Sequence, residues 1–268
     1  MRLTSLKNPK IKYVYKLRNR RFRDRERKTL LEGYRELTRS LEYGMNILEV
    51  FYCPEMFLGS NEFPLLDKLR EKGVQVIEVT EPILEKLAYR DRPEGLIAVA
   101  EVLSHRLEDI PVVENGLYLL AESIEKPGNL GSILRSADAA GVTGVILCDK
   151  CTDIYNPNVI RASTGALFSV PLAECTREEA DEWLKKNKIT VLAATPHTDH
   201  YHTDVDLTKS VAIAVGTEQS GLTDFWMNGA DLKVKIPMLG KIDSLNVATA
   251  TTILLYEAAR QRNWVVAK

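Results

Sequence analysis

Apolar residues in the second half of the chain come in short uninterrupted runs, separated by longer amphipathic stretches. Runs of Val, Ile, Leu and Ala without alternation are typical of strands buried on both faces. Such runs predict strands at 117–121, 144–148, 189–194, 211–215 and 232–236. Helices are expected at 130–140, 156–165, 177–187, 223–228 and 245–262. Buried strands that alternate with helices favour an α/β fold with a parallel sheet covered on both faces.

The first hundred residues carry a separate pattern. A basic segment from about 9 to 43 is predicted to be helical, since apolar residues at 30–41 recur at three- and four-residue spacing. Strands are expected at 47–52, 74–79 and 95–102, with a helix at 63–72. Residues 106–116 mix charge, Pro and Gly without a period, as linkers do. We therefore predict a small N-terminal α/β domain at 1–105, a linker at 106–116 and a second domain at 117–268.

Charge is distributed unevenly along the chain. Residues 1–28 hold twelve Lys or Arg and two acids, a net charge of +10, so the rest carries −11 within a total of −1. A basic end on an acidic body is a pattern expected of a surface that binds nucleic acid. A solvated helix face is the alternative, because most charge runs are no more than that.

The composition is that of a globular protein, with 45% hydrophobic and 27% charged residues. No apolar run approaches the ~20 residues that span a bilayer, and the N-terminus lacks the apolar core of a secretory signal. We therefore expect a cytoplasmic protein that has no membrane partner.

Cysteine and histidine give little indication of metal chemistry. Cys148 and Cys151 form a C-x-x-C, but no second close pair completes a zinc site. His197, His200 and His202 cluster without a supporting carboxylate or Cys pattern, which favours a polar loop. We expect no metal.

Three polar segments follow predicted strands. The first is E-K-P-G-N-L-G-S-I-L-R at 125–135, and the second is G-T-E-Q-S-G-L at 216–222. The third joins I-P-M at 236–238 to S-L-N-V at 244–247. In open α/β sheets the ligand crevice lies at the carboxyl ends of the strands. These segments therefore predict one site assembled from parts far apart in the sequence.

Ordinary structural roles account for several of these residues. Asn129 and Ser244 are both good helix N-caps, and Glu218 can be read as a solvated acid in a turn. Arg135 suits bidentate phosphate binding, or is a plain surface residue. Asn246, at the start of the predicted helix, is less easily explained, because Asn has a low helix propensity.

Two familiar nucleotide-binding motifs are absent. The first polar segment is not followed by Gly-Lys-Ser/Thr, so it is not a Walker A loop. No G-x-G-x-x-G follows a strand, which makes a dinucleotide-dependent oxidoreductase a poor candidate.

Taken together, the segments resemble the signature motifs of the SpoU/TrmH family of RNA ribose 2′-O-methyltransferases, in the SPOUT superfamily. The N-x-G-x-x-x-R motif is met by Asn129, Gly131 and Arg135. The other two, G-x-E-x-x-G-L and I-P-M with S-L-N, are met at 216–222 and at 236–246. The N-terminal part also resembles the substrate-binding domain often fused to this family, through L-E-G-Y-R at 31–35 and R-P-E-G-L at 92–96. Thr217 and Lys126 depart from the commonest residues, Asn and Asp.

The resemblance implies a deep trefoil knot in the C-terminal domain, a rare exception to the rule against threaded chains. It also implies a homodimer and a site for S-adenosylmethionine inside the knot. The residues expected to cradle this cofactor are Thr195, Gly216, Ile236, Met238 and Leu245.

The implied reaction transfers a methyl group to a ribose 2′-hydroxyl, with ribosomal RNA favoured over transfer RNA. The expected catalytic residues are Arg135, Asn129, Glu218, Ser244 and Asn246. Arg135 either acts as the base or only orients the hydroxyl, since a guanidinium resists deprotonation. RNA contacts are expected from Lys10, Lys12, Arg18, Arg20, Arg21, Arg23 and Arg35. A catalytically silent RNA-binding factor of the same fold is the alternative, as is a methyltransferase acting on transfer RNA.

Overall fold

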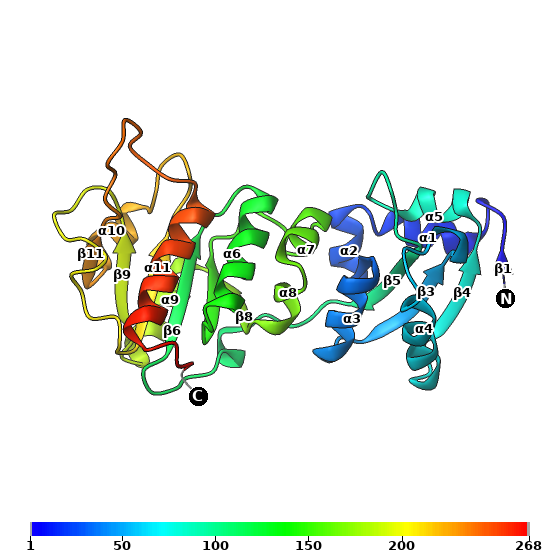
Figure 1. Ribbon diagram of the computed structural model, residues 1–268, viewed down its shortest axis with the longest axis horizontal. Coiled ribbons are helices and arrows are strands. Elements are labelled where there is room, and N and C mark those ends of the chain that lie inside the picture. The colour runs from blue at the N-terminus through cyan, green and yellow to red at the C-terminus, as the bar shows by residue number, and fades with distance from the viewer. Residues whose placement is uncertain (1, 267–268) are drawn as a thin grey trace. The chain divides into compact units, whose positions relative to one another are not determined.

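The computed structural model describes residues 2–266, in two compact units. One unit contains the chain up to Ser104 together with Tyr155–Phe168, and the other contains His105–Ile154 and the chain from Ser169 onward. The segment 155–168 therefore packs with the first unit, although its sequence lies inside the second (Figure 1). Among the described residues, each helix is too short or too polar to cross a membrane.

The first unit is built on a mixed five-stranded sheet in the order β1-β4-β3-β5-β2. Strand β3 pairs in parallel with β4 and antiparallel with β5, and β5 pairs antiparallel with β2. The strands are β1 (Arg2–Leu3), β2 (Lys28–Glu32), β3 (Ile47–Tyr52), β4 (Gln75–Val79) and β5 (Leu96–Glu101). The helices are α1 (Pro9–Lys16), α2 (Arg20–Glu26), α3 (Tyr34–Glu42), α4 (Glu62–Glu71) and α5 (Glu81–Leu87), with α7 (Pro157–Ser163), α8 (Ala166–Ser169) and the 3₁₀ turn η1 (Pro54–Met56).

The long basic helix predicted over 9–43 was wrong. Helix α1 ends at Lys16, α2 begins after the N-cap Asn19, and strand β2 lies between α2 and α3. Arg27 closes α2 in the left-handed conformation, at φ 53°. The next residues, Thr29 to Leu31, are buried against β5. Sheet pairing therefore overrides the helical spacing of this segment.

The second unit contains a parallel sheet, as the apolar runs predict, and its six strands lie in the order β11-β9-β10-β6-β7-β8. The strands are β6 (Leu117–Glu122), β7 (Gly144–Cys148), β8 (Leu172–Cys175), β9 (Thr190–Ala194), β10 (Val211–Val215) and β11 (Leu232–Val234). The helices are α6 (Pro127–Ala139), α9 (Arg177–Lys186), α10 (Asp224–Gly229) and α11 (Val247–Gln261), with the 3₁₀ turn η2 (Leu107–Asp109). Strand β8 was not predicted.

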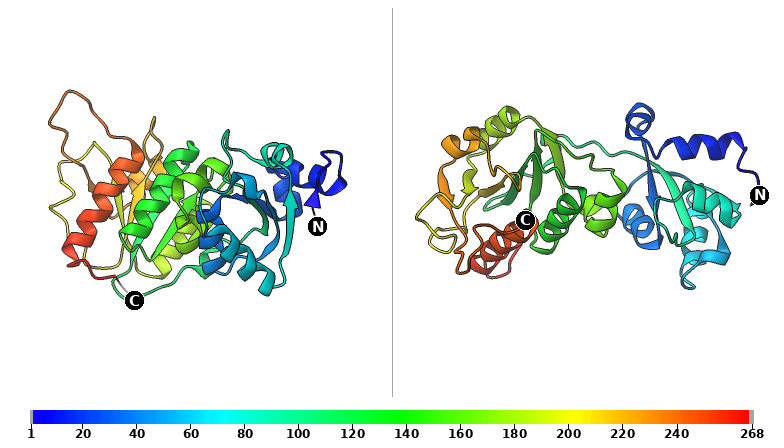
Figure 2. Two further views of the ribbon diagram at one scale, coloured as in Figure 1. Left: turned by 45° about the vertical axis from the view of Figure 1, so that its right-hand side comes forward. Right: turned by 90° about the horizontal axis from the view of Figure 1, so that it is seen from above.

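Helices cover both faces of this sheet (Figure 2). One face packs on α9 and α10 in a cluster that includes Tyr118, Leu184 and Trp226. Helices α6 and α11 pack against each other on the other side, where Ser136 and Thr252 hydroxyls are 2.7 Å apart. Burial on both faces explains why the strands read as unbroken apolar runs.

Candidate active site

The loops that carry the three motifs leave the sheet at one edge. Strands β6 and β10 are neighbours and run in parallel, so their carboxyl ends lie together. The first motif follows β6 and opens α6, and the second follows β10. The third lies between β11 and α11.

Side chains from all three motifs meet at the carboxylate of Glu218. Asn246 donates from Nδ2 to Glu218 Oε1 at 2.7 Å, and Asn129 Nδ2 donates to the same oxygen. Lys126 pairs through Nζ with Glu218 Oε2. Asn246 Nδ2 also lies 3.2 Å from Asn129 Oδ1. We call Lys126, Asn129, Glu218 and Asn246 the polar cluster.

Helix capping explains why these amides are available. Pro127 is the first residue of α6 and Lys126 is its N-cap, so the prediction of Asn129 as the cap was wrong. Asn129 instead lies inside the first turn, where its amide is free to reach Glu218.

The predicted cap at Ser244 was also wrong. Asn246 caps α11 by accepting from Ala248 N–H at 3.0 Å, which leaves its Nδ2 to donate to Glu218. Ser244 lies two residues before the cap and its hydroxyl bonds Asp243 at 3.2 Å. The structure therefore brings Asn129, Glu218 and Asn246 together, while Ser244 stays outside the polar cluster.

The second loop depends on a glycine at its entrance. Thr217 and Gly221 exchange two backbone hydrogen bonds of 3.0 Å, which fold the loop back on itself. A Cβ on Gly216 would lie 2.1 Å from the carbonyl oxygen of Gly221. No other residue permits this closure, so the loop that presents Glu218 requires Gly216.

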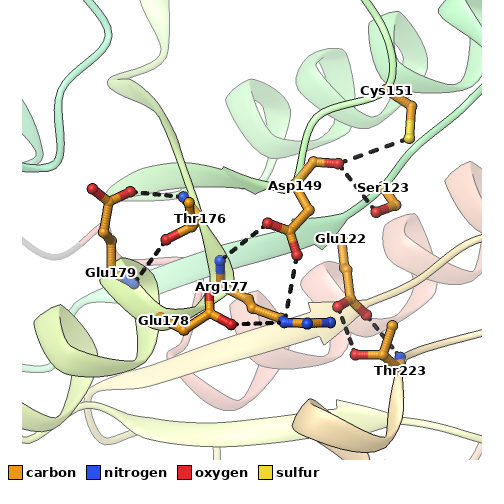
Figure 3. Close-up of polar contacts among 9 residues, drawn as sticks. All are labelled: Glu122, Ser123, Asp149, Cys151, Thr176, Arg177, Glu178, Glu179 and Thr223. Carbon is orange, nitrogen blue, oxygen red and sulfur yellow. Dashed lines mark hydrogen bonds and ion pairs between the residues drawn. The ribbon is translucent and has the colours of Figure 1, made fainter.

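The far end of the same loop is held by a buried acid that the sequence reasoning missed. Glu122, 1% exposed at the end of β6, accepts from Thr223 N–H at 2.8 Å and from Thr223 Oγ1 at 2.7 Å (Figure 3). Thr223 follows the loop directly and is the N-cap of α10. A carboxylate near a helix N-terminus is favourable. An acid ending an otherwise apolar strand was the signal available in the sequence.

Arg135 lies apart from the polar cluster. It is exposed on α6 and makes no hydrogen bond or ion pair within the described residues. It is six residues beyond Asn129, which is about one and two-thirds helical turns, so the two side chains leave different faces. Arg135 is available to a ligand or to a second chain.

The residues expected to cradle a cofactor occupy the loops after β9, β10 and β11. Thr195 is buried, donates its N–H to Val234 O at 2.9 Å and accepts from His197 N–H at 3.2 Å. Ile236, Met238 and Leu245 are half-buried, in contrast to Leu239, which is 97% exposed. These apolar side chains can pack against a flat, weakly polar ligand at the edge of the sheet.

The basic residues of the first unit have different environments. Lys12, Arg20, Arg21 and Arg35 are exposed. Lys10 is committed to an ion pair with Glu49 and a bond to Gln75 of 2.9 Å.

Arg23 is 5% exposed, which does not suit an RNA contact. Its guanidinium donates at 2.9 Å to the carbonyls of Leu17 and Arg18, and at 3.1 Å to the Tyr89 hydroxyl. These bonds hold the turn between α1 and α2, so the role of Arg23 is structural.

Over residues 2–266, no group of three or more His, Cys, Asp or Glu is placed to hold a metal ion. The cysteines are free, and a side-chain hydrogen bond with Cys175 together with burial raises the pKa of the Cys148 thiol.

Two known families match this chain, and together they cover most of its length. The SpoU rRNA Methylase family matches residues 116–256, the part that contains the parallel sheet and the polar cluster. The chain belongs to the SpoU rRNA methylase family. The MRM3-like substrate binding domain matches residues 8–98.

One similar relative is the 23S rRNA (uridine(2479)-2'-O)-methyltransferase of Streptomyces viridochromogenes, 34% identical over 92% of this chain and 87% of the relative. A crystal structure of an RNA 2'-O ribose methyltransferase is 40% identical with a TM-score of 0.87, covering 98% of this chain and all of the other. An AdoMet-bound rRNA methyltransferase from Sinorhizobium meliloti is 32% identical with a TM-score of 0.89, covering 97% of each chain.

Proposed function

We propose that this SpoU family member is an S-adenosylmethionine-dependent methyltransferase that modifies a ribose 2′-hydroxyl of ribosomal RNA. The observation that carries the proposal is the polar cluster, in which Asn129 of the first motif and Asn246 of the third meet the Glu218 carboxylate of the second. Relatives that match over most of the chain are named as RNA 2′-O-methyltransferases, which supports the same reaction. A ribosomal RNA substrate implies a cytoplasmic protein.

The loops beside the polar cluster fit the proposed cofactor. The half-buried side chains of Ile236, Met238 and Leu245 suit the flat face of an adenine. Gly216 lets the neighbouring loop close on its own backbone, which keeps that loop folded beside them. When bound, S-adenosylmethionine supplies an electrophilic methyl group on a sulfonium. We infer that Thr195, Gly216 and these three residues hold it.

The residues of this chain then have to position the ribose and assist the loss of its proton. Glu218 and the two amides orient the sugar hydroxyl, which raises the rate by reducing the freedom of the reacting atoms. Arg135 supplies positive charge that stabilises the 2′-oxyanion as the hydroxyl proton passes to water. A guanidinium does this without itself giving up a proton.

We further propose that the protein is a homodimer whose second chain completes the site. Four apolar residues are 41–70% exposed: Tyr256 within α11, and Trp264, Val265 and Val266 just beyond its end. Contiguous exposed apolar residues of this kind mark interaction surfaces. Arg135, whose side chain has no partner among residues 2–266, is then available to the site of either subunit.

A deep trefoil knot in the second unit is also part of the proposal. Support comes from Arg262, directly after α11, whose side chain binds the backbone of loops from earlier in the chain. Arg262 donates to Leu207 O at 2.8 Å and to Lys209 O at 2.6 Å, and also to Asn115 O.

The Arg135→Ala variant tests the proposal. We expect it to bind S-adenosylmethionine with unchanged affinity by calorimetry, and to lose methyl transfer to ribosomal RNA. Lys186→Ala is the control, because it removes one exposed charge from α9 on the opposite layer and should leave turnover unchanged. Wild-type turnover in Arg135→Ala would refute the assignment. No cofactor binding by the wild-type protein would favour a catalytically silent RNA-binding factor.

A further inference from the structure

Two helices of the first unit border an open surface hollow. The proposed reaction does not use it. It has a volume of about 610 Å³ and lies where α1 ends and α2 begins. Its lining consists of two aromatic rings and four cations, with one amide and no acid; these are Tyr15, Phe22, Lys16, Arg18, Arg21 and Arg25, with Asn19. We call this the basic hollow.

Of the two aromatic rings of the basic hollow, one is exposed and the other is held in place. Tyr15 is 39% exposed. Phe22 is packed edge-on by Tyr13, with ring centroids 5.6 Å apart and planes at 69°. Tyr13 is itself fixed by a hydroxyl bond of 3.0 Å to Glu26. A ring fixed in this way loses little freedom when a ligand packs on it, which favours binding.

The buried Arg23 fixes the angle between the two helices. Its guanidinium bonds the carbonyls of Leu17 and Arg18, in the turn that follows α1, and the Tyr89 hydroxyl. The turn between the two helices is therefore held by the fold, and the exposed side chains of the basic hollow are mounted on it.

Cations already stack on both rings. The Arg18 guanidinium lies 5.4 Å from the Tyr15 ring centre and Lys86 Nζ lies 4.4 Å from it. Arg25 lies 4.6 Å from the centre of Phe22. An exposed cation–π contact is weaker than the stacking of a nucleic-acid base on an aromatic ring. A base can therefore take the ring face, and the displaced cation can move to the phosphate beside it.

We propose that the basic hollow binds an unpaired nucleotide of the RNA substrate, with its base stacked on Tyr15 or Phe22 and its phosphates on the surrounding Arg and Lys. This deepens the proposed function and rests on it. An unpaired strand fits better than a duplex, because bases inside a duplex do not offer their faces to side chains. The absence of acid from the lining favours a polyanion.

The test uses the full chain and an eight-nucleotide oligouridine, with binding followed by fluorescence anisotropy. Tyr15→Ala should weaken binding by about 5- to 100-fold, the range measured for loss of one stacked base. Tyr15→Trp should restore binding, and its indole emission should be quenched by the oligonucleotide. Tyr43→Ala is the matched control, because Tyr43 is 49% exposed at the end of α3 and is not among the residues of the basic hollow.

An abasic oligonucleotide of the same length separates stacking from charge. Tyr15→Ala should bind it as the wild type does, and the dependence of affinity on salt should be the same for both proteins, since the number of phosphate contacts is unchanged. Equal oligouridine affinity for wild type and Tyr15→Ala would overturn the inference. Methyl transfer by the wild-type protein would in that case leave the proposed function standing.

Discussion

At the scale of single residues, the site depends on one carboxylate that three other side chains approach. The Lys126–Glu218 pair is exposed on the lysine side, and exposed pairs contribute little to stability. The two amides bind the same carboxylate oxygen and come from two different helix starts. Glu218 therefore has its main role in setting the geometry of the site.

Replacing this carboxylate should reduce activity far more than stability. We expect Glu218→Gln to lower kcat/KM by about a hundredfold, because misplacing a reacting group by about an ångström has an effect of that size. Thermal unfolding should change little, since Glu218 lies in an exposed turn. Glu125→Gln is the control, as it removes an exposed acid from the neighbouring loop. Equal losses in the two variants would contradict the role given to Glu218.

The sequence predicted which residues lie together better than it predicted how they are bonded. The motif residues Asn129, Glu218 and Asn246 were all chosen correctly as neighbours at the edge of the sheet. Their bonds depend on where each helix starts, and Pro127 moves the start of α6 ahead of Asn129. Capping preference alone gives no way to choose among several good caps a few residues apart.

At the scale of elements, the loop at 216–222 is fixed at both ends. Its entrance closes through the paired bonds between Thr217 and Gly221, and its exit is held by Glu122 through Thr223. A loop held in this way presents Glu218 in one position, which a site of this kind requires.

Gly216→Ala should open the entrance of this loop. The added Cβ meets a backbone atom, which cannot move aside as a flexible side chain would. We expect the affinity for S-adenosylmethionine, measured by calorimetry, to fall at least tenfold. Gly240→Ala is the matched control, because a Cβ there meets no atom within 4 Å. Normal cofactor affinity in Gly216→Ala would show that the loop tolerates the change.

Glu122→Ala should destabilise the second unit. The change leaves Thr223 without the acceptor for its N–H and hydroxyl, and unsatisfied partly buried groups of this kind cost about 1–3 kcal/mol. Urea unfolding should show the loss, and Glu125→Ala should leave the midpoint where it is. A Glu122→Ala protein as stable as the wild type would mean that water replaces the carboxylate.

Short or partly polar strands were the elements that sequence patterns missed. Strand β8 has four residues and follows Pro171. Strand β2 contains Lys28 and Thr29 and directly follows a basic helix. Its residues therefore fit the spacing of a helix as well as that of a strand. In both cases pairing with a distant strand decides the conformation.

At the scale of the whole molecule, the parallel sheet of the second unit was predictable and the structure of the first unit was less so. Long apolar runs identify buried strands without ambiguity. The first unit mixes parallel and antiparallel pairs over shorter strands. Its stability also involves two buried acids, Glu32 and Glu36, next to Arg90.

These acids make stability depend on pH. Burial raises the pKa of Glu32 and of Glu36 above the ordinary value of 4.5. The folded state then holds more protons than the unfolded state above about pH 4.5. Their contribution to stability is therefore full below that pH and is lost as pH rises through the folded pKa.

Glu32→Gln should flatten this dependence. The amide oxygen can still accept from Tyr89 N–H, which lies 2.9 Å from the carboxylate, and position 32 then carries no charge at any pH. The free energy of unfolding in urea, measured between pH 4 and pH 7, should fall with pH more steeply for the wild type than for Glu32→Gln. Parallel curves would show that the buried carboxyl titrates normally.

The central claim is that three separated loops form one site for methyl transfer to a ribose. The most direct measurement supplies methyl-labelled S-adenosylmethionine and ribosomal RNA that lacks 2′-O-methyl groups, then locates the label by nuclease digestion and mass spectrometry. We predict that the label is found on the 2′-oxygen of one nucleotide and is lost with Glu218→Gln. Label on a base, or none despite measured cofactor binding, would contradict the account.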